Sequence, residues 1–334
     1  MRAARLIDDY DGVLLDLDGV VYVGPHAVTG APETICVLRE AGTGVAFVTN
    51  NAARTPDQVA SALTAIGVPA APADVVTAAQ AAARLLAERV PAGSAVLVVG
   101  GAGLRAALEE YELRPVATAD DSPVAVIQGW SPDLAWPLLA EGCVAIARGL
   151  PWVASNTDAT IPTARGLAPG SGAFVDAIAG ATRRRPAVAG KPEPPLLEYA
   201  VERVRATRPL FVGDRLDTDI AGAIRVRMDS LLVLSGVSQP LDLLHADATA
   251  RPTHVSLDLR GLLDPAPVIE VDGHRARCGG WTVSAGPPLE IEGAGDPIDG
   301  LRALCCMAWA AADLHPVAST ELEAALDRIG LAAS

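Results

Sequence analysis

Short apolar segments alternate with amphipathic segments along the first two thirds of the chain. Gly12–Leu15, Gly44–Val48 and Pro209–Val212 are almost continuously apolar, which is typical of strands buried on both faces of a parallel sheet. Segments of helical periodicity follow, such as Ala31–Ala41 and Thr55–Ile66, each with a proline in its first turn. This alternation predicts an α/β fold with right-handed crossovers.

A second run of strands and helices interrupts the first. Ala95–Val99, Val124–Gln128 and Trp152–Ser155 read as further buried strands separated by helical segments. The first pattern resumes at Ala187–Ala189, a short strand that we place with the core. We therefore expect one α/β domain inserted into another.

The character of the sequence changes after about residue 262. A hairpin of Val268–Val271 with Arg277–Val283 is expected, then a glycine-rich loop and two helices. Its apolar residues are too few to fold alone, so we expect it to pack on the core or to build an oligomer. The expected organisation is a parallel-sheet core (1–80 and 183–261), an inserted α/β domain (81–182) and a small α+β appendage (262–334) of unknown role.

Acidic and small polar side chains follow the predicted core strands directly. Asp16 and Asp18 come after the first strand, Thr49 after the second and Asp214 after a later one. Because the carboxyl ends of parallel strands meet at one edge of an open sheet, these groups should converge where such sheets bind ligands. The full expected set is Asp16, Asp18, Thr49, Lys191, Asp214 and Asp219.

The chemistry of this set points to phosphoryl transfer. Four carboxylates at one edge repel each other unless a cation lies between them, and oxygen ligands suit Mg²⁺. Asp16 can accept a phosphoryl group, while Asp18 can protonate the leaving oxygen and later activate water. Thr49 and Lys191 supply a hydroxyl group and a positive charge for the phosphoryl oxygens.

Other interpretations of these segments are weaker. The Asp16–Gly19 pattern also occurs in calcium loops, but valines occupy the following positions where further ligands would be needed. Gly100–Gly103 resembles part of a dinucleotide-binding loop, yet the third glycine is missing, which favours a tight strand-to-helix turn. Asp217 reads as an acid in the first turn of a helix.

Four segments together resemble the motifs of the haloacid dehalogenase superfamily, in the same order. They are Asp16–Val21, Val48–Asn51, Gly190–Pro192 and Gly213–Ile220. The insertion resembles the α/β cap of the branch that contains phosphoglycolate, 4-nitrophenyl phosphate, glycerol-3-phosphate and pyridoxal phosphate phosphatases. That likeness implies a Rossmann-like core, and the acid at position 18 favours a phosphatase over a dehalogenase.

The resemblance also implies residue roles. Asp16 would be the nucleophile and Asp18 the general acid and base. Mg²⁺ would be held by the Asp16 carboxylate, the Asp18 main-chain carbonyl and Asp214, while Asp219 would orient a metal-bound water or Lys191. Substrate-binding residues would be Gly19, Thr49, Asn50, Asn51 and Lys191, with Asn156, Thr157, Asp158 and the loop Pro169–Gly172 as the specificity region of the cap.

The expected function is hydrolysis of small phosphomonoesters, with glycerol 3-phosphate or 2-phosphoglycolate first. A pyridoxal or aryl phosphate phosphatase is the alternative within enzymes, and a non-catalytic ligand-sensing protein is the alternative outside them. The appendage is faintly similar to part of an acetyltransferase domain, but it lacks the glycine-rich loop for acyl-CoA, so that activity is not expected.

Bulk composition limits the partners. A net charge of −14 disfavours nucleic acid and anionic membrane surfaces, which need a basic face. The five cysteines show neither metal-ligand spacing nor a disulfide framework, and no apolar run is long enough to span a bilayer. We expect a cytoplasmic protein acting on a small phosphorylated metabolite, and the sequence leaves a homo-oligomer open.

Overall fold

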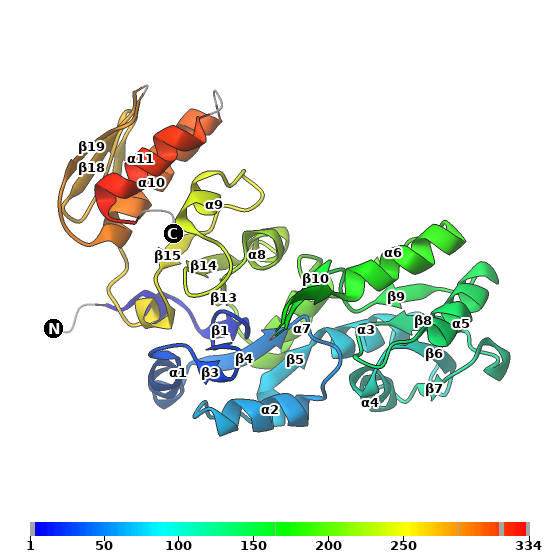
Figure 1. Cartoon of the computed structure of the whole chain (residues 1–334). Coiled ribbons are helices and arrows are strands. Elements are labelled where there is room, and N and C mark those ends of the chain that lie inside the picture. Colours follow the sequence, from blue (N-terminus) through cyan, green and yellow to red (C-terminus); the bar gives the residue numbers. More distant parts are fainter. Residues whose placement is uncertain (1–3, 164, 287, 314–316, 332–334) are drawn as a thin grey trace. The chain divides into compact units, whose positions relative to one another are not determined.

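The computed structural model describes residues 4–163, 165–286, 288–313 and 317–331 (Figure 1). The chain forms two compact units. The first combines Met1–Val45 with Ala206–Ser334, and the second is Ala46–Arg205. Both units contain parallel strands connected by helices, so the α/β fold class is confirmed. The expected cap boundaries, 81–182, stay a prediction, because the two compact units divide the chain at other positions.

Four parallel strands form the sheet of the first unit. Their spatial order is β15, β14, β13, β1, so strands from both ends of the chain lie side by side. All four residues of β1 are buried, as their apolar character predicts. The bounds are β1 (Gly12–Leu15), β13 (Pro209–Gly213), β14 (Asp229–Val233) and β15 (His254–Ser256).

Short helices and turns connect these strands. After β13, a π-helical turn leads directly into a single short helix. The remaining elements of this part are η1 (Leu6–Asp9), β2 (Tyr22–Val23), β3 (His26–Ala27), α1 (Ala31–Glu40), η4 (Leu216–Ile220), α8 (Ala221–Arg225), α9 (Pro240–Leu244) and η5 (Leu259–Leu262).

The appendage is an antiparallel sheet with two helices on one side (Figure 1). The expected strand Arg277–Val283 is wrong, because the chain turns at Gly279 with φ +54 and forms two strands. A further strand lies in the region expected to be a loop. The elements are β16 (Ile269–Asp272), β17 (Arg275–Cys278), β18 (Trp281–Ser284), β19 (Glu290–Gly293), α10 (Pro297–Ala312) and α11 (Ser319–Ile329).

The appendage packs on the rest of the first unit, as one of the two sequence interpretations proposed. Leu301 and Leu326 belong to the same hydrophobic cluster as Leu232 of β14 and Val255 of β15. Polar contacts reinforce this packing, since the Arg302 guanidinium donates to the Val255 carbonyl through Nη2 at 2.7 Å and Nε at 3.1 Å. The appendage is therefore an integral part of this unit.

The second unit contains two sets of parallel strands. β4 (Gly44–Thr49), which begins at the end of the first unit, pairs with β5 (Val75–Thr77). A five-stranded sheet has the order β12, β9, β8, β6, β7. We expected the β12 segment to belong with the core strands, but it pairs with β9. The bounds are β6 (Ala95–Val99), β7 (Arg114–Val116), β8 (Ala125–Gln128), β9 (Trp152–Ala154) and β12 (Ala187–Val188).

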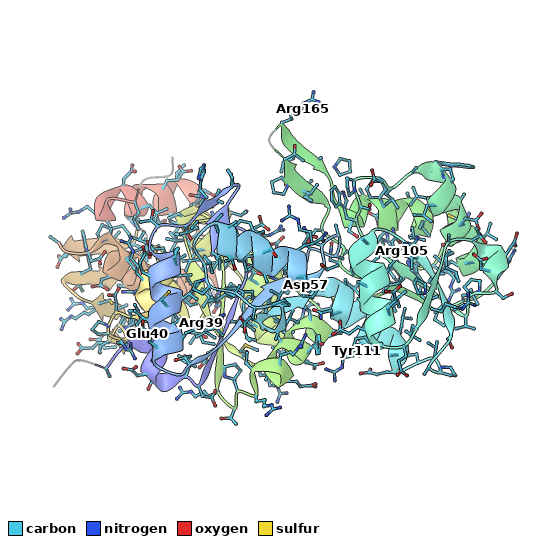
Figure 2. All side chains as sticks on the ribbon, turned by 90° about the horizontal axis from the view of Figure 1, so that it is seen from below. Arg39, Glu40, Asp57, Arg105, Tyr111 and Arg165 are labelled. Carbon is cyan, nitrogen blue, oxygen red and sulfur yellow. The ribbon has the colours of Figure 1, made fainter. Side chains whose placement is uncertain are left out.

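Helices and one hairpin complete the second unit. Arg165 lies at the turn of the hairpin, which projects from the unit (Figure 2). Its short, exposed, proline-containing strands carry no alternating pattern, so the sequence did not predict them. The elements are α2 (Pro56–Ala65), η2 (Pro72–Asp74), α3 (Ala78–Ala87), α4 (Ala102–Glu110), η3 (Ala119–Asp121), α5 (Trp136–Ala147), β10 (Thr160–Thr163), β11 (Gly166–Pro169), α6 (Ser171–Thr182) and α7 (Pro194–Val204).

Within the described residues, every helix is too short or too polar to cross a bilayer.

The glycine-rich turn Gly100–Gly103 has a packing explanation. A Cβ at Gly103 would overlap the Ala52 carbonyl oxygen, and the Gly103 N–H donates to the Ala53 carbonyl at 3.2 Å. The glycines therefore allow the start of α4 to approach another main chain closely, as expected for a tight turn.

Candidate active site

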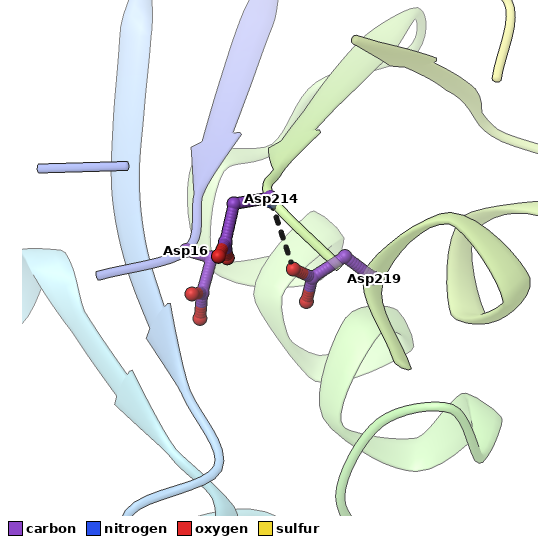
Figure 3. Close-up of side chains that lie close together, drawn as sticks. All are labelled: Asp16, Asp214 and Asp219. Atoms are coloured by element: carbon purple, nitrogen blue, oxygen red, sulfur yellow. Dashed lines mark hydrogen bonds between the residues drawn. The ribbon is translucent and has the colours of Figure 1, made fainter. Parts of the chain in front are cut away.

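Three acidic side chains cluster in the first unit. One carboxylate oxygen from each of Asp16, Asp214 and Asp219 lies within 4.8 Å of the others (Figure 3). Asp16 is 9% exposed, Asp214 0% and Asp219 1%. Buried carboxylates this close repel each other strongly unless protons or a cation balance their charge. Among the described residues, this is the one group of three or more acidic, histidine or cysteine side chains with that spacing.

Adjacent strands bring Asp16 and Asp214 together. β1 and β13 pair in parallel, with Leu15 opposite Val212. The ladder continues one residue further, where the Asp16 N–H donates to the Val212 carbonyl at 2.9 Å. Asp16 and Asp214 therefore both follow the last paired residues, at the carboxyl edge of the sheet, as the sequence predicts.

The loop after β14 holds the Asp214 carboxylate. The Val237 N–H donates to Asp214 Oδ2 at 2.7 Å, and the Ser238 N–H donates to the Asp214 carbonyl at 3.0 Å. A Cβ at Gly236 or at Gly19 would overlap this carboxylate. Gly19 also has φ +87, which favours glycine. Sequence reasoning assigned Gly19 to substrate binding and missed the loop at 235–238.

Asp219 shapes the turn that carries Asp214. Its Oδ2 accepts the main-chain N–H groups of both Asp214 and Arg215, each at 3.1 Å (Figure 3). A Cβ at Gly213 would overlap the Asp219 side chain, so glycine is required there. Asp219 thus supports the main chain of the acidic cluster. Its expected role of orienting water or Lys191 stays a prediction.

Asp217 lies outside the cluster. The Arg215 guanidinium donates to its two carboxylate oxygens at 3.0 and 2.7 Å. This bonding lowers the pKa of the Asp217 carboxyl below its ordinary value. Asp217 is therefore an ion-paired acid at the start of the turn, and a site role is not needed to explain it.

Asp18 differs from its neighbours because it is exposed to solvent. The Tyr22 hydroxyl donates to Asp18 Oδ2 at 3.2 Å, and the Gly19 N–H donates to the Tyr22 carbonyl at 2.8 Å. The Ser235 hydroxyl donates to the Gly19 carbonyl at 2.7 Å, which joins this turn to the loop after β14. An acid with access to water suits proton exchange during catalysis.

Thr49 and Asn51 come directly after β4 in the second unit. The buried Thr49 Oγ1 accepts the Asn51 N–H at 3.0 Å, which leaves the hydroxyl proton of Thr49 to be donated elsewhere. Asn51 Oδ1 accepts the Ala53 N–H at 2.9 Å, and this bond uses no amide proton. Both side chains therefore keep donors that a phosphoryl group requires.

The structure brings Lys191 together with Asn50, Asn156 and Asp158. Lys191 follows β12, whereas Asn156 and Asp158 follow β9. Because β12 and β9 pair in parallel, the loops after them leave the same edge of the sheet. Asn50 hydrogen-bonds to the Lys191 main chain and to the Asp158 carboxylate. The Thr157 side chain is exposed. Lys191 itself is 2% exposed.

The expected specificity loop Pro169–Gly172 contacts the same segment through its main chain. The Gly170 N–H donates to the Ala159 carbonyl at 2.9 Å, and the Gly172 N–H donates to the Asp158 carbonyl at 2.8 Å. A Cβ at Gly172 would overlap the Thr157 carbonyl oxygen. The glycines of this loop therefore fix the segment 157–159 against the start of α6.

Family comparisons agree with this geometry. Residues 13–114 match the haloacid dehalogenase-like hydrolases, and residues 188–262 match a HAD-hydrolase-like family. Residues 278–331 match the GCN5-related N-acetyltransferase like domain. These matches contain the three clustered acids and Thr49, Asn50, Asn51 and Lys191.

Individual relatives are phosphatases. The chain is 41% identical over 318 residues to the D-glycerol 3-phosphate phosphatase of Mycobacterium tuberculosis, covering 93% of this chain and 89% of the relative. A glycerol phosphate phosphatase from the same organism, solved with magnesium, superposes with a TM-score of 0.86 at 39% identity over 99% of this chain and 100% of that one. The p-nitrophenyl phosphatase from Archaeoglobus fulgidus has a TM-score of 0.70 at 26% identity, over 76% and 98%.

Proposed function

We propose, since the chain belongs to the haloacid dehalogenase-like hydrolases, that it is a Mg²⁺-dependent phosphatase acting on small phosphomonoesters through an aspartyl-phosphate intermediate. The observation that carries the proposal is the clustering of buried Asp16, Asp214 and Asp219 within 4.8 Å. Such a cluster combines a nucleophile with the oxygen ligands that a hard cation prefers.

Glycerol 3-phosphate is the substrate that we favour. The relative named for that substrate covers 93% of this chain, including the appendage. 2-Phosphoglycolate is the second small ester to test. An aryl phosphate such as 4-nitrophenyl phosphate is a further candidate, because the similar Archaeoglobus fulgidus protein is a p-nitrophenyl phosphatase.

Asp16 and Asp18 carry the two chemical steps of the proposal. An Asp16 carboxylate oxygen attacks phosphorus while the ester P–O bond breaks, and Asp18 gives its proton to the leaving alcohol oxygen. Asp18 then removes a proton from water as the water oxygen attacks phosphorus. The bond between phosphorus and the Asp16 oxygen breaks, which releases inorganic phosphate and restores both carboxyl groups.

The donor set fits Mg²⁺. Its groups are oxygen atoms with a strongly negative total charge, and softer sulfur or nitrogen ligands are absent from the described cluster. The carboxylates of Asp16 and Asp214, together with the main-chain carbonyl of Asp18, would hold the ion. When bound, Mg²⁺ offsets the negative charge of the carboxylates and the phosphoryl oxygens. Thr49, Asn51 and Lys191 contribute the donors and the positive charge for that group.

Location and partners belong to the same proposal. All five cysteines are free, which supports a reducing, cytoplasmic compartment. The net charge of −14 supports small phosphorylated metabolites over nucleic acid as partners. A homo-oligomer is left open.

A kinetic screen tests the proposed function. Purified protein is assayed for phosphate release from glycerol 3-phosphate, 2-phosphoglycolate, pyridoxal phosphate and 4-nitrophenyl phosphate, with Mg²⁺ and with excess chelator. We expect turnover only with Mg²⁺, and at least 10³-fold lower kcat for Asp16→Asn with an unchanged far-UV spectrum. Absence of turnover on every ester, or near wild-type activity of Asp16→Asn, would contradict the proposal. The first result would favour a ligand-sensing protein.

A further inference from the structure

The Asn50 side chain grips the main chain of Lys191 at two points. Its Oδ1 accepts the Lys191 N–H at 2.8 Å, and its Nδ2 donates to the Lys191 carbonyl at 3.0 Å. A side-chain amide that pairs with both polar atoms of one residue fixes the position and the direction of that stretch of main chain. The main chain of Lys191 is therefore fixed by Asn50, independently of where the ammonium group of Lys191 points.

The second amide proton of Asn50 is also used. Nδ2 lies 3.2 and 3.3 Å from the two carboxylate oxygens of Asp158. An asparagine side chain has two N–H donors, and here one serves Lys191 and the other Asp158. The amide cannot be turned over, because its oxygen would then face the Lys191 carbonyl and a carboxylate. Phosphoryl oxygens are acceptors, so the Asn50 side chain could bind them only by giving up one of these bonds.

Asn156 closes the arrangement into a ring. Its Nδ2 donates to the Asn50 carbonyl at 2.6 Å, and its Oδ1 accepts the Asp158 N–H at 3.1 Å. Asn156 is buried, and Asn50 and Asp158 are half-buried. Hydrogen bonds that are partly shielded from water contribute more than exposed ones, so the ring is a rigid support.

Gly190 makes this close approach possible. A Cβ at Gly190 would overlap both the Ser155 carbonyl oxygen and Asn50 Oδ1. Leu196 returns its N–H to the Ala189 carbonyl at 2.9 Å, which ties the same turn to α7. The motif glycine before the lysine thus allows the Asn50 side chain to reach the lysine main chain.

We propose that the side chains of Asn50, Asn156 and Asp158 form a positioning frame for Lys191 and do not themselves contact the substrate. The inference rests on the proposed function, since it assigns Lys191 to the phosphoryl group. It replaces the expectation that Asn50 binds phosphate and that Asn156 and Asp158 select the alcohol part of the ester. In the loop after β4, the side-chain donors for the phosphoryl group are then Thr49 and Asn51.

Hydrogen exchange tests the frame without any turnover. Asn50→Ala removes the acceptor of the Lys191 amide, so that amide should exchange about tenfold faster or more. Asn51→Ala is the matched control, since it changes the adjacent residue and leaves the Lys191 bonds in place. The Leu196 amide should keep its exchange rate in both variants. Unchanged exchange at Lys191 in Asn50→Ala would overturn the proposal.

Kinetics separate positioning from specificity. A frame that acts through Lys191 affects every ester alike, so Asp158→Asn should lower kcat on glycerol 3-phosphate and 4-nitrophenyl phosphate by the same factor, about tenfold. Asp133→Asn, an exposed acid of the same unit, is the control for charge. A change of more than about fivefold in the ratio of the two kcat/KM values would show contact with the alcohol part and overturn the proposal.

A pair exchange provides the second kinetic arm. Asn50→Asp places a carboxylate against Asp158 and should lower kcat by about 10²-fold or more. Adding Asp158→Asn restores a donor and an acceptor to that contact and should recover about tenfold. A double variant no better than Asn50→Asp would count against the ring. If wild-type protein hydrolyses no ester, the proposed function fails. The hydrogen-exchange measurement at the Lys191 amide then still decides whether the frame exists.

Discussion

Asp219 holds the main chain of Asp214, because its Oδ2 accepts the Asp214 N–H at 3.1 Å within the buried acidic cluster. The same oxygen accepts the Arg215 N–H at 3.1 Å. One carboxylate of the cluster therefore shapes the turn on which another is presented. Loss of its charge and loss of its hydrogen bonds are distinct perturbations, and two substitutions separate them.

Asp219→Ala should lower the free energy of unfolding more than Asp219→Asn does. Alanine leaves two main-chain N–H groups near the site without their acceptor, at about 1–3 kcal/mol each where they are buried. Asparagine keeps an oxygen in place and mainly removes charge. Urea unfolding with and without Mg²⁺ measures the stability of each variant and its gain from the ion. Equal stability of the two variants would contradict the structural role of Asp219.

Gly19→Ala should weaken the response to Mg²⁺, and Gly24→Ala should not. Both glycines have positive φ, +87 and +57, so both substitutions strain the main chain by about 1–2 kcal/mol. A Cβ at Gly19 would overlap the Asp214 carboxylate, whereas a Cβ at Gly24 meets no atom within 4 Å. The Mg²⁺ concentration for half-maximal activity is the measurement. We expect an increase of about tenfold or more for Gly19→Ala alone, and equal values in both variants would be the contrary result.

Appendage residues should matter for the stability of the first unit. Leu301 is fully buried in the cluster shared with β14 and β15, so Leu301→Ala should cost about 2–5 kcal/mol. Leu167, 76% exposed on the hairpin β10–β11, is the control, and Leu167→Ala should stay within about 0.5 kcal/mol. Both free energies come from urea unfolding. A Leu301→Ala variant as stable as Leu167→Ala would mean that the appendage does not support the fold.

Stability should fall below neutral pH because of His254. Its Nε2 lies 3.0 Å from the Tyr10 hydroxyl, which donates to Asp229. Burial is the main cause that lowers the pKa of His254 below its ordinary value of 6.5; the charged groups around it are Asp9, Arg208, Asp229 and Arg302. The folded state thus favours the neutral ring, while the unfolded chain takes up a proton below about pH 6.5.

The lowered pKa of His254 determines how stability should depend on pH. Stability from His254 is complete above about pH 6.5 and decreases as the pH falls, by at most about 1.4 kcal/mol per pH unit. Urea unfolding between pH 8 and pH 5 measures it. His254→Gln should flatten this part of the profile, and a variant with the wild-type slope would assign the effect to other groups.

The strand-end acids were predictable from sequence for a physical reason. Gly12–Leu15 and Pro209–Val212 are apolar enough to be read as buried strands, and parallel pairing then places Asp16 and Asp214 at one edge. The positions of these residues therefore follow from local pattern and sheet geometry alone.

Other parts of the site depend on long-range contacts that local pattern does not encode. The loop at 235–238 holds Asp214 through main-chain N–H groups and a glycine, and such atoms leave no signature in the sequence. The pairing of β12 with β9 is fixed by tertiary structure, so the meeting of Lys191 with Asn156 and Asp158 was not foreseen. The family resemblance implied that Asn50 binds the phosphoryl group, and the bonds of its side chain to Lys191 and Asp158 could not be predicted from the sequence.

In the proposed mechanism, Asp16 carries the phosphoryl group during turnover. The most direct measurement is rapid quenching in acid of the Mg²⁺-loaded protein with ³²P-labelled glycerol 3-phosphate, followed by peptide mapping. We predict acid-stable, base-labile label on the peptide that contains Asp16, and none in Asp16→Asn. Turnover of the labelled ester without label on that peptide, or label retained in Asp16→Asn, would exclude Asp16 as the residue that carries the phosphoryl group.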